Sequence, residues 1–256
     1  MPLRKWTKEE EKKLKHLYLK TKTPVEEICR IIDRTPPAIQ NRFKVLGFKK
    51  RRFPSKTKHP DKVTPALARI HAHICGDGYF YKTKVKDSYG PWAKYRKKTH
   101  RIIYRTCYSN TNPTLIKEFR RDIKEVFGVK GGKLWKNEIR IKSKRIWDLL
   151  KKMGAGDSYN WSVGKEIINA SKESKKNWIK AFFDDEAYFD NGNRIRVKCV
   201  NKKGLQEVTK ILNEFIPCHL LPKKGSYWGN TYCININKKD VPKYLSKIGS
   251  LRYKQR

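Results

Sequence analysis

Two acidic residues, Asp77 and Glu186, occupy the same place in two similar segments of the chain. Residues 70–80 read IHAHICGDGYF and residues 179–189 read IKAFFDDEAYF, so both fit the pattern I-x-A-x-x-x-x-acid-small-Tyr-Phe. Two carboxylates held side by side repel each other unless a cation lies between them, and hard oxygen ligands suit Mg²⁺. A metal ion held in this way can activate water and stabilise the leaving 3′ oxygen of a phosphodiester. The pair therefore predicts a divalent metal site of a kind that could support phosphodiester hydrolysis.

The elements that must bring the acids together are two helices, each ending at one of the acids. Ala72 and Ala181 stand at the third position of each segment, and Gly76 stands at the seventh position of the first. Small residues allow two helices to approach closely, because the distance between helix axes depends on the side chains at the contact. We therefore expect the two helices to pack side by side.

A longer duplication surrounds both acids. Residues 138–154 (EIRIKSKRIWDLLKKMG) match residues 233–249 (CININKKDVPKYLSKIG). The two acids are 109 positions apart (186 − 77), whereas the two closing glycines are 95 positions apart (249 − 154). The first repeat is therefore longer by 14 residues (109 − 95). We place these extra residues in a hairpin around residues 82–99. Each repeat is expected to run helix, two strands, helix, two strands, helix.

Polar and apolar residues alternate along the predicted strands. Such alternation predicts a sheet with one apolar face against helices and one polar face outward. A basic and amide-bearing face suits the DNA major groove, and an ordinary solvated sheet face is the alternative. The strand residues predicted to contact DNA are Arg101, Arg105, Arg140, Lys142, Arg194, Arg196, Lys198, Asn235 and Asn237.

The composition narrows the class of protein. The 62 Lys and Arg residues outnumber the 24 Asp and Glu residues, and the net charge of +38 predicts a polyanionic partner. The six cysteines include no CxxC pair, which argues against zinc knuckles and against a disulfide framework. The sequence has no apolar run typical of a signal peptide or a membrane span. We expect an intracellular protein with no membrane partner, cytoplasmic and nucleoid-associated if prokaryotic.

Residues 1–48 predict a separate three-helix domain. Thr7 and Glu10 have the spacing of a capping box, and Pro36 suits the first turn of a third helix that turns Gln40, Asn41 and Lys44 outward. The segments W-T-x-E-E and R-T-P-P-A-I-Q-N-R-F-K-V-L-G resemble the Myb/SANT-like helix-turn-helix family, which implies DNA binding by these three residues. A protein-interaction module is the alternative. Residues 49–64 are rich in Lys, Arg and Pro and predict a basic linker.

Residues 65–256 resemble the LAGLIDADG homing endonucleases in their single-chain, two-repeat form. The resemblance rests on the two motif segments, each followed by the duplicated context. It implies an α+β fold in which two pseudo-symmetric αββαββα repeats, residues 65–164 and 165–256, form a DNA-binding saddle. It also implies one acid from each repeat holding Mg²⁺, or another divalent cation such as Mn²⁺, with one acid serving each DNA strand. The departures are Cys75 at an acidic position, Asp185 at a small packing position and Ala187 in place of glycine.

The same family places a basic residue, often a lysine, near each metal site. By this resemblance Lys254 would serve one site and Lys165 the other, and contact with the DNA backbone alone is the alternative for both. His71 and His73 lie two residues apart on the first motif helix and are interpreted as packing or surface residues rather than metal ligands.

The function predicted from these features is site-specific cleavage of double-stranded DNA by a monomer, encoded by a mobile intron or a free-standing gene. Two alternatives remain open. One is an RNA maturase with intron RNA as its partner, because the charge suits RNA equally well. The other is a non-catalytic DNA-binding regulator on the same scaffold.

Overall fold

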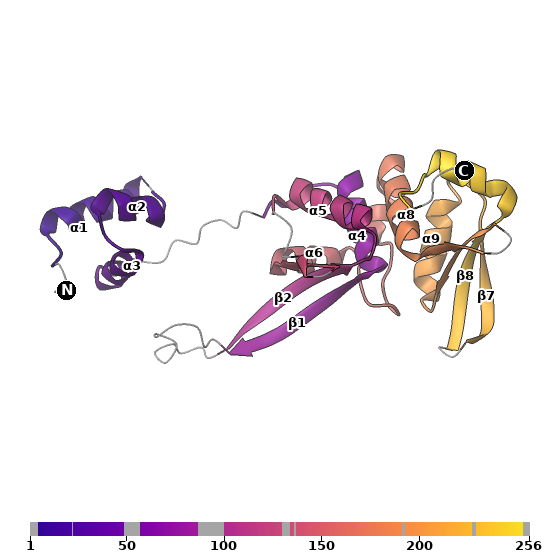
Figure 1. Cartoon of the computed structure of the whole chain (residues 1–256), viewed down its shortest axis with the longest axis horizontal. Coiled ribbons are helices and arrows are strands. Elements are labelled where there is room, and N and C mark those ends of the chain that lie inside the picture. The colour runs from indigo at the N-terminus through magenta and orange to yellow at the C-terminus, as the bar shows by residue number, and fades with distance from the viewer. Residues whose placement is uncertain are drawn as a thin grey trace. The chain divides into compact units, whose positions relative to one another are not determined.

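The chain divides into two compact units, Met1–Ser55 and Lys56–Arg256, shown in Figure 1. The computed structural model describes residues 5–21, 23–48, 57–86, 100–129, 134–135, 137–190, 193–226 and 229–252. Each unit has a hydrophobic core of its own. The boundary falls within the segment predicted to be a linker.

The first unit is built from helices α1 (Lys8–Lys15), α2 (Val25–Ile32) and α3 (Pro36–Val45), with the π-helical turn η1 (His16–Lys20) continuing α1. The expected capping box is present at the start of α1. Its two bonds are the donation from Glu10 N to Thr7 Oγ1 at 3.1 Å and the return donation from Thr7 N to Glu10 Oε2 at 3.0 Å. The buried side chains of this unit are Leu14, Tyr18, Ile28, Ile32, Ile39 and Phe43.

The second unit contains two repeats with the same order of elements. The first repeat consists of α4 (Pro65–Cys75), β1 (Gly78–Lys86), β2 (His100–Ser109), α5 (Pro113–Phe127), β3 (Leu134–Trp135), β4 (Glu138–Lys142) and α6 (Lys144–Lys152). The short helix α7 (Lys165–Ile168) leads to the second repeat, which consists of α8 (Lys172–Glu186), β5 (Ala187–Phe189), β6 (Ile195–Cys199), α9 (Lys202–Leu212), β7 (His219–Ser226), β8 (Gly229–Ile236), η3 (Lys238–Asp240) and α10 (Val241–Lys247). Their antiparallel sheets have the orders β1-β2-β4-β3 and β5-β6-β8-β7, which confirms the predicted α+β fold of two repeats.

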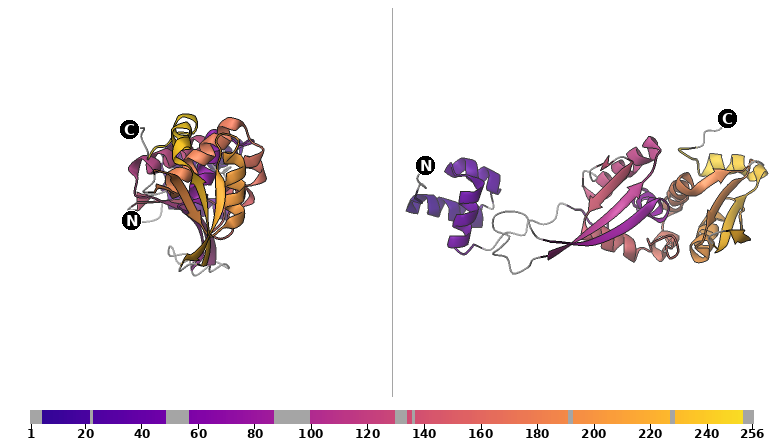
Figure 2. Two further views of the ribbon diagram at one scale, coloured as in Figure 1. Left: turned by 90° about the vertical axis from the view of Figure 1, so that its right-hand side faces the viewer. Right: turned by 60° about the horizontal axis from the view of Figure 1, so that its bottom comes forward.

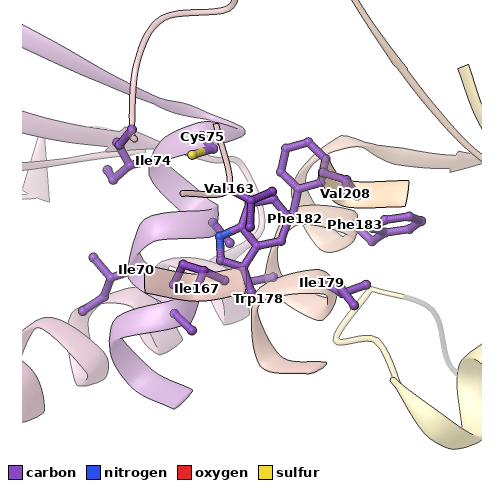
Figure 3. Packing of buried hydrophobic residues seen from close by; sticks show 14 of the residues in the cluster. Ile70, Ile74, Cys75, Val163, Ile167, Trp178, Ile179, Phe182, Phe183 and Val208 are labelled. Carbon is purple, nitrogen blue, oxygen red and sulfur yellow. The ribbon is translucent and has the colours of Figure 1, made fainter. Parts of the chain in front are cut away.

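Helices α4 and α8 lie side by side where the two repeats meet (Figure 1). A single hydrophobic core crosses this contact, and Figure 3 shows Ile70 of α4 with Trp178 and Phe182 of α8 in the same cluster. The close approach depends on Gly76, because a Cβ atom added there would come within 3.0 Å of Cβ of Asp185. The packing of two motif helices expected from the small residues is therefore present.

The difference in length between the repeats has two parts. Gly78 pairs with Tyr108 and Ala187 pairs with Val197, so equivalent residues are 89 positions apart at this point (197 − 108). The first repeat thus has 20 extra residues in the hairpin formed by its first two strands (109 − 89), and the second repeat regains 6 before its closing glycine (95 − 89). The long hairpins are β1–β2 in one repeat and β7–β8 in the other, and both extend past the covering helices (Figure 2). The prediction of a single hairpin surplus was incomplete.

The two faces of each sheet differ as the alternation predicted. Ile139 and Ile141 of β4 are buried against the helices, as are Ile195 and Val197 of β6. The polar residues between them lie on the opposite face. Among the described residues, no helix has both the length and the apolar character needed to cross a membrane.

Candidate active site

Asp77 and Glu186 lie at corresponding ends of the two central helices. Helix α4 ends at Cys75 and Asp77 directly precedes β1, while α8 ends at Glu186 directly before β5. Asp77 and Glu186 are both half-buried. Since α4 and α8 lie side by side, the structure brings the two predicted acids to the same end of the helix pair.

The two acids are poorly solvated and lie in a negative environment. Burial and, to a smaller extent, the charge of Asp185 raise the pKa of Asp77 to about 6, against opposing effects of Asn110, His73 and Arg252. Burial also raises the pKa of Glu186 to about 7, with contributions from the charges of Asp77 and Asp185. The three carboxylates are therefore close enough for their charges to repel.

Asp185 stands where a small residue was expected, and both oxygens of its carboxylate have partners within the protein. Its Oδ2 atom lies 2.8 Å from Nδ1 of His73, and both side chains are completely buried. Its Oδ1 atom accepts hydrogen bonds from Tyr108 Oη at 2.8 Å and from Asn110 Nδ2 at 3.1 Å. Burial disfavours the charged form of His73, but the carboxylates of Asp185 and Glu118 outweigh this effect and raise the pKa of His73 to about 10. Asp185 is thus the partner of a buried imidazolium.

Asn110 is a site residue that the sequence analysis missed. Its Nδ2 atom donates to Oδ2 of Asp77 at 2.7 Å as well as to Asp185. Its own amide is held in turn, because Oδ1 of Asn110 accepts from the backbone N of Asn112 at 2.8 Å. Asn110 directly follows β2 and stands two residues before the N-cap of α5. A polar residue at this position, at the end of the strand beside the motif, is a sequence signal that could have identified Asn110.

The second repeat has a cysteine at the position of Asn110. Asn112 and Asn201 are the N-caps of α5 and α9, so the residue two before each N-cap is Asn110 in one repeat and Cys199 in the other. Burial raises the pKa of the Cys199 thiol, and the negative charge of Glu186 raises it further, which indicates that Cys199 lies near Glu186. The two acids therefore have different polar neighbours.

The segment after the last helix is attached to α8 beside the acids. The carboxylate of Asp184 accepts hydrogen bonds from the Ser250 hydroxyl and from the backbone N of Leu251, the latter at 3.0 Å. Nη1 of Arg252 donates to the backbone carbonyls of Asp184 at 3.0 Å and Asp185 at 3.2 Å, at the C-terminal end of α8, where a cation is favoured. The charge of Arg252 lowers the pKa of Asp77, so this guanidinium lies close to the acids.

The two predicted lysines are placed differently. Lys254 lies outside the described residues, although Arg252 of the same segment lies beside the acids. Lys165 is exposed at the first residue of α7. That helix leads away from the acids, because Glu166 and Asn169 line a pocket together with Thr64 at the opposite end of α4. The structure does not bring Lys165 together with Asp77 or Glu186.

A divalent cation is compatible with the two acids. Among the residues that the structure describes, no group of three or more His, Cys, Asp or Glu side chains is arranged to hold a metal ion. The protein would therefore supply the carboxylates of Asp77 and Glu186, whose pKa values are raised mainly by burial. Mg²⁺ is commonly held by one or two carboxylates, with phosphate oxygens and water completing its shell. The pair fits such a cation once a phosphate is bound.

The predicted DNA-contacting residues lie on the polar faces of the two sheets and on α3. Arg105 pairs in register with Tyr81 and Lys142, and its guanidinium lies 5.7 Å from the Tyr81 ring centre. Arg101 pairs with Val85 through the backbone, and its side chain lies outside the described part of the structure. The polar face of the second sheet carries Arg194, Arg196, Lys198, Asn235 and Asn237. The polar face of the first sheet also carries Arg140. On α3, the exposed residues are Gln40, Asn41 and Lys44.

Solved structures similar to this chain include those of the homing endonuclease I-DmoI. Variants of I-DmoI are 21% identical to this chain with a TM-score of 0.55, covering 73% of this chain and 96% of that one. I-DmoI in complex with DNA and Ca is 22% identical with a TM-score of 0.54, covering 73% and 91% of the two chains. For I-DmoI with DNA and Mn the identity is 22%, the TM-score 0.53 and the coverage 73% and 98%. No family model and no curated protein matches the chain.

These similarities define the class of fold. Residues of the second unit adopt the two-repeat α+β fold of the LAGLIDADG endonucleases. In particular, the chain is similar in fold to I-DmoI over 73% of its own length.

Proposed function

We propose that this protein is a site-specific double-strand DNA endonuclease that hydrolyses phosphodiester bonds with a divalent cation held by Asp77 and Glu186. The observation that carries the proposal is the pair of half-buried carboxylates at the joined ends of α4 and α8, one from each repeat, with their pKa values raised to about 6 and about 7. The similarity in fold to I-DmoI, a homing endonuclease seen in complexes with DNA and with Ca or Mn, supports it.

The roles of the side chains follow from their contacts. When bound, Mg²⁺ or Mn²⁺ would lower the pKa of a water molecule and neutralise charge on the phosphate. Asn110 holds the carboxylate of Asp77 in one orientation through the 2.7 Å hydrogen bond. Arg252 contributes positive charge beside Asp77, where a scissile phosphate would lie. We therefore assign a supporting role to Arg252 beside the predicted Lys254 of the same segment, and no part in the chemistry to Lys165.

DNA binding is assigned to the polar sheet faces. The net charge of +38 favours a polyanion, and the Arg, Lys and Asn side chains named above can contact phosphates and base edges. A single chain carries both acids, so we propose that it acts as a monomer on an asymmetric site. The exposed residues Gln40, Asn41 and Lys44 of α3 would extend the contact through the first unit.

Cleavage of supercoiled plasmid tests the proposal. Wild-type protein with Mg²⁺ is screened against a plasmid library of candidate sites and compared with Asp77→Asn and Glu186→Gln. We expect the wild type to linearise its target, and each variant to lose at least ~100-fold in strand cleavage while still binding. Glu173→Gln is the matched control, because Glu173 lies on the same helix as Glu186 but near its other end, with a side chain 62% exposed.

Two outcomes would contradict the proposal. Failure of the wild type to cut any member of a broad library would exclude a nuclease and favour the DNA-binding regulator. Splicing of an intron RNA that is stimulated equally by wild type and by both acid variants would favour the maturase.

A further inference from the structure

On the polar face of each sheet, an acidic side chain holds arginines that were predicted to contact DNA. In the first repeat Tyr79, Cys107 and Arg140 stand directly opposite one another on β1, β2 and β4, so their side chains share one face. Glu138 stands two residues before Arg140 on β4 and shares that face. It is the face opposite to the buried Ile139 and Ile141.

The Glu138 carboxylate accepts two hydrogen bonds from one edge of the Arg140 guanidinium. Its Oε1 atom accepts from Arg140 Nε at 2.7 Å and its Oε2 atom accepts from Arg140 Nη2 at 2.8 Å. Oε1 also accepts from the Tyr79 hydroxyl at 2.7 Å, which fixes the carboxylate itself. The hydrogen bonds from Arg140 lower the pKa of Glu138 to about 2, so the acid is ionised at neutral pH. The pair is bidentate, and it orients the plane of the guanidinium.

The second repeat has a similar contact between one acid and two arginines, at a different position in its sheet. The Oδ2 atom of Asp190 lies 2.8 Å from Nε of Arg194 and 2.9 Å from Nε of Arg196. The Oδ1 atom of Asp190 accepts from the backbone N of Arg194 at 3.0 Å. The side chain of Arg196 also donates to Oδ1 of Asn235 at 3.3 Å. The Asp190 side chain is only 13% exposed, whereas that of Arg194 is 42% exposed.

These acids are unexpected on a face that meets phosphates. The chain has only 24 acidic residues against 62 basic ones, and a carboxylate facing DNA weakens binding through repulsion. A guanidinium held by a carboxylate, however, loses little rotational freedom when it meets a base and is kept from turning to the nearest phosphate. The planar fork of a guanidinium matches O6 and N7 of guanine, the commonest base contact of arginine.

We propose that Glu138 and Asp190 determine base specificity by fixing Arg140 in one half of the site, and Arg194 with Arg196 in the other, for recognition of guanine. This inference rests on the proposed DNA endonuclease function. According to this inference, the two acids increase the selectivity for a base sequence and lower the affinity for DNA. That combination distinguishes it from a purely structural role, in which affinity and selectivity would fall together.

Selection from a randomised DNA duplex library tests the proposal, with Ca²⁺ in place of Mg²⁺ to allow recovery of intact DNA. For Glu138→Gln we expect tighter binding to random duplex, and a loss of about tenfold or more in the preference for guanine at one position of one half-site. Asp190→Asn should change the other half-site only. Glu173→Gln removes the same charge far from the sheets and should leave the selected site unchanged.

A second measurement probes the base contact directly. Wild-type protein is assayed on its selected site with 7-deazaguanine in place of each guanine, because this base lacks the N7 acceptor. We expect weaker binding at the position altered in Glu138→Gln, and no such weakening there in Arg140→Lys. An unchanged selected site in both Glu138→Gln and Asp190→Asn, or no response to 7-deazaguanine, would overturn the inference. If the wild type selects no sequence at all, the proposed function itself fails.

Discussion

The Nδ1 atom of His73 on α4 lies 2.8 Å from Oδ2 of Asp185 on α8, with both side chains completely buried. This ion pair crosses between the two repeats. It occupies the small packing position of the second motif, and Gly76 opposite it leaves the room that the Asp185 side chain requires. Because Asp185 also binds Asn110, and Asn110 binds Asp77, the pair connects the packing of the helices to the geometry of the candidate site.

Removing one partner of this pair should destabilise the second unit strongly. Asp185→Ala leaves the His73 imidazolium buried without its nearest counter-ion, and a loss of about 3–5 kcal/mol in the free energy of unfolding is expected. Urea unfolding followed by tryptophan fluorescence measures it. The exposed pair Lys144–Asp148 on α6 is the control, since Asp148→Ala should cost at most ~0.5 kcal/mol. Equal losses of unfolding free energy in the two variants would show that the buried pair stabilises the protein no more than the exposed pair does.

Gly78, at the start of β1, should not tolerate a side chain. A Cβ atom there would lie 2.4 Å from Cα of Ile74, a backbone atom that cannot move aside. Gly78→Ala is therefore expected to cost about 1–3 kcal/mol of stability, as in other overpacked sites. Chemical denaturation measures the change, and a Gly78→Ala protein as stable as the wild type would contradict the prediction.

The different neighbours of the two acids should make strand cleavage unequal when Asn110 is removed. Asn110→Ala releases the carboxylate of Asp77, and a loss of about 10–100-fold in the rate at one strand is expected, as for other residues that orient metal ligands. A time course on supercoiled plasmid should then show nicked DNA accumulating before linear DNA. Cys199→Ala is the matched variant in the other repeat and should keep the wild-type time course. Equal slowing of both strands by Asn110→Ala would be inconsistent with a role confined to Asp77.

Metal-free protein should lose stability as the pH rises, because of the two acids. A carboxyl group whose pKa is higher in the folded state than in the unfolded state binds its proton more tightly when folded. Its contribution to stability is complete below the unfolded pKa near 4 and is lost as the pH rises through about 6 for Asp77 and about 7 for Glu186. The double variant Asp77→Asn, Glu186→Gln should therefore gain Tm relative to the wild type between pH 4.5 and pH 8.

Added Mg²⁺ should reverse this effect in the wild type only. Thermal melts in EDTA and in Mg²⁺ at pH 8 are compared, and an increase in Tm is expected for the wild type but not for the double variant. Comparing variant with wild type cancels the contribution of groups such as His73, which titrate in both. A difference in Tm that stays constant across the pH range would argue against raised pKa values at these two acids.

Much of the fold could be predicted because the signals are local and occur twice. The duplicated motif, the alternation in strands such as residues 138–142 and the capping box of Thr7 and Glu10 each depend on residues close together in the chain. Local spacing was sufficient to expect two equivalent repeats, the apolar faces of their sheets and the meeting of Asp77 with Glu186. The same reasoning selected the segment at residues 251–255, in which Arg252 lies beside the acids and Lys254 stays a prediction.

The partners of the acids were decided by tertiary structure alone. Asn110 lies 33 positions from Asp77, and His73 lies 112 positions from Asp185, so no local pattern relates them. Sequence alone establishes which residues can carry charge and which face of a helix or strand they occupy. Which charges meet depends on how closely α4 and α8 approach and on where the ends of β2 and the C-terminal segment fall, because hydrogen bonds and ion pairs require contact over about 3 Å.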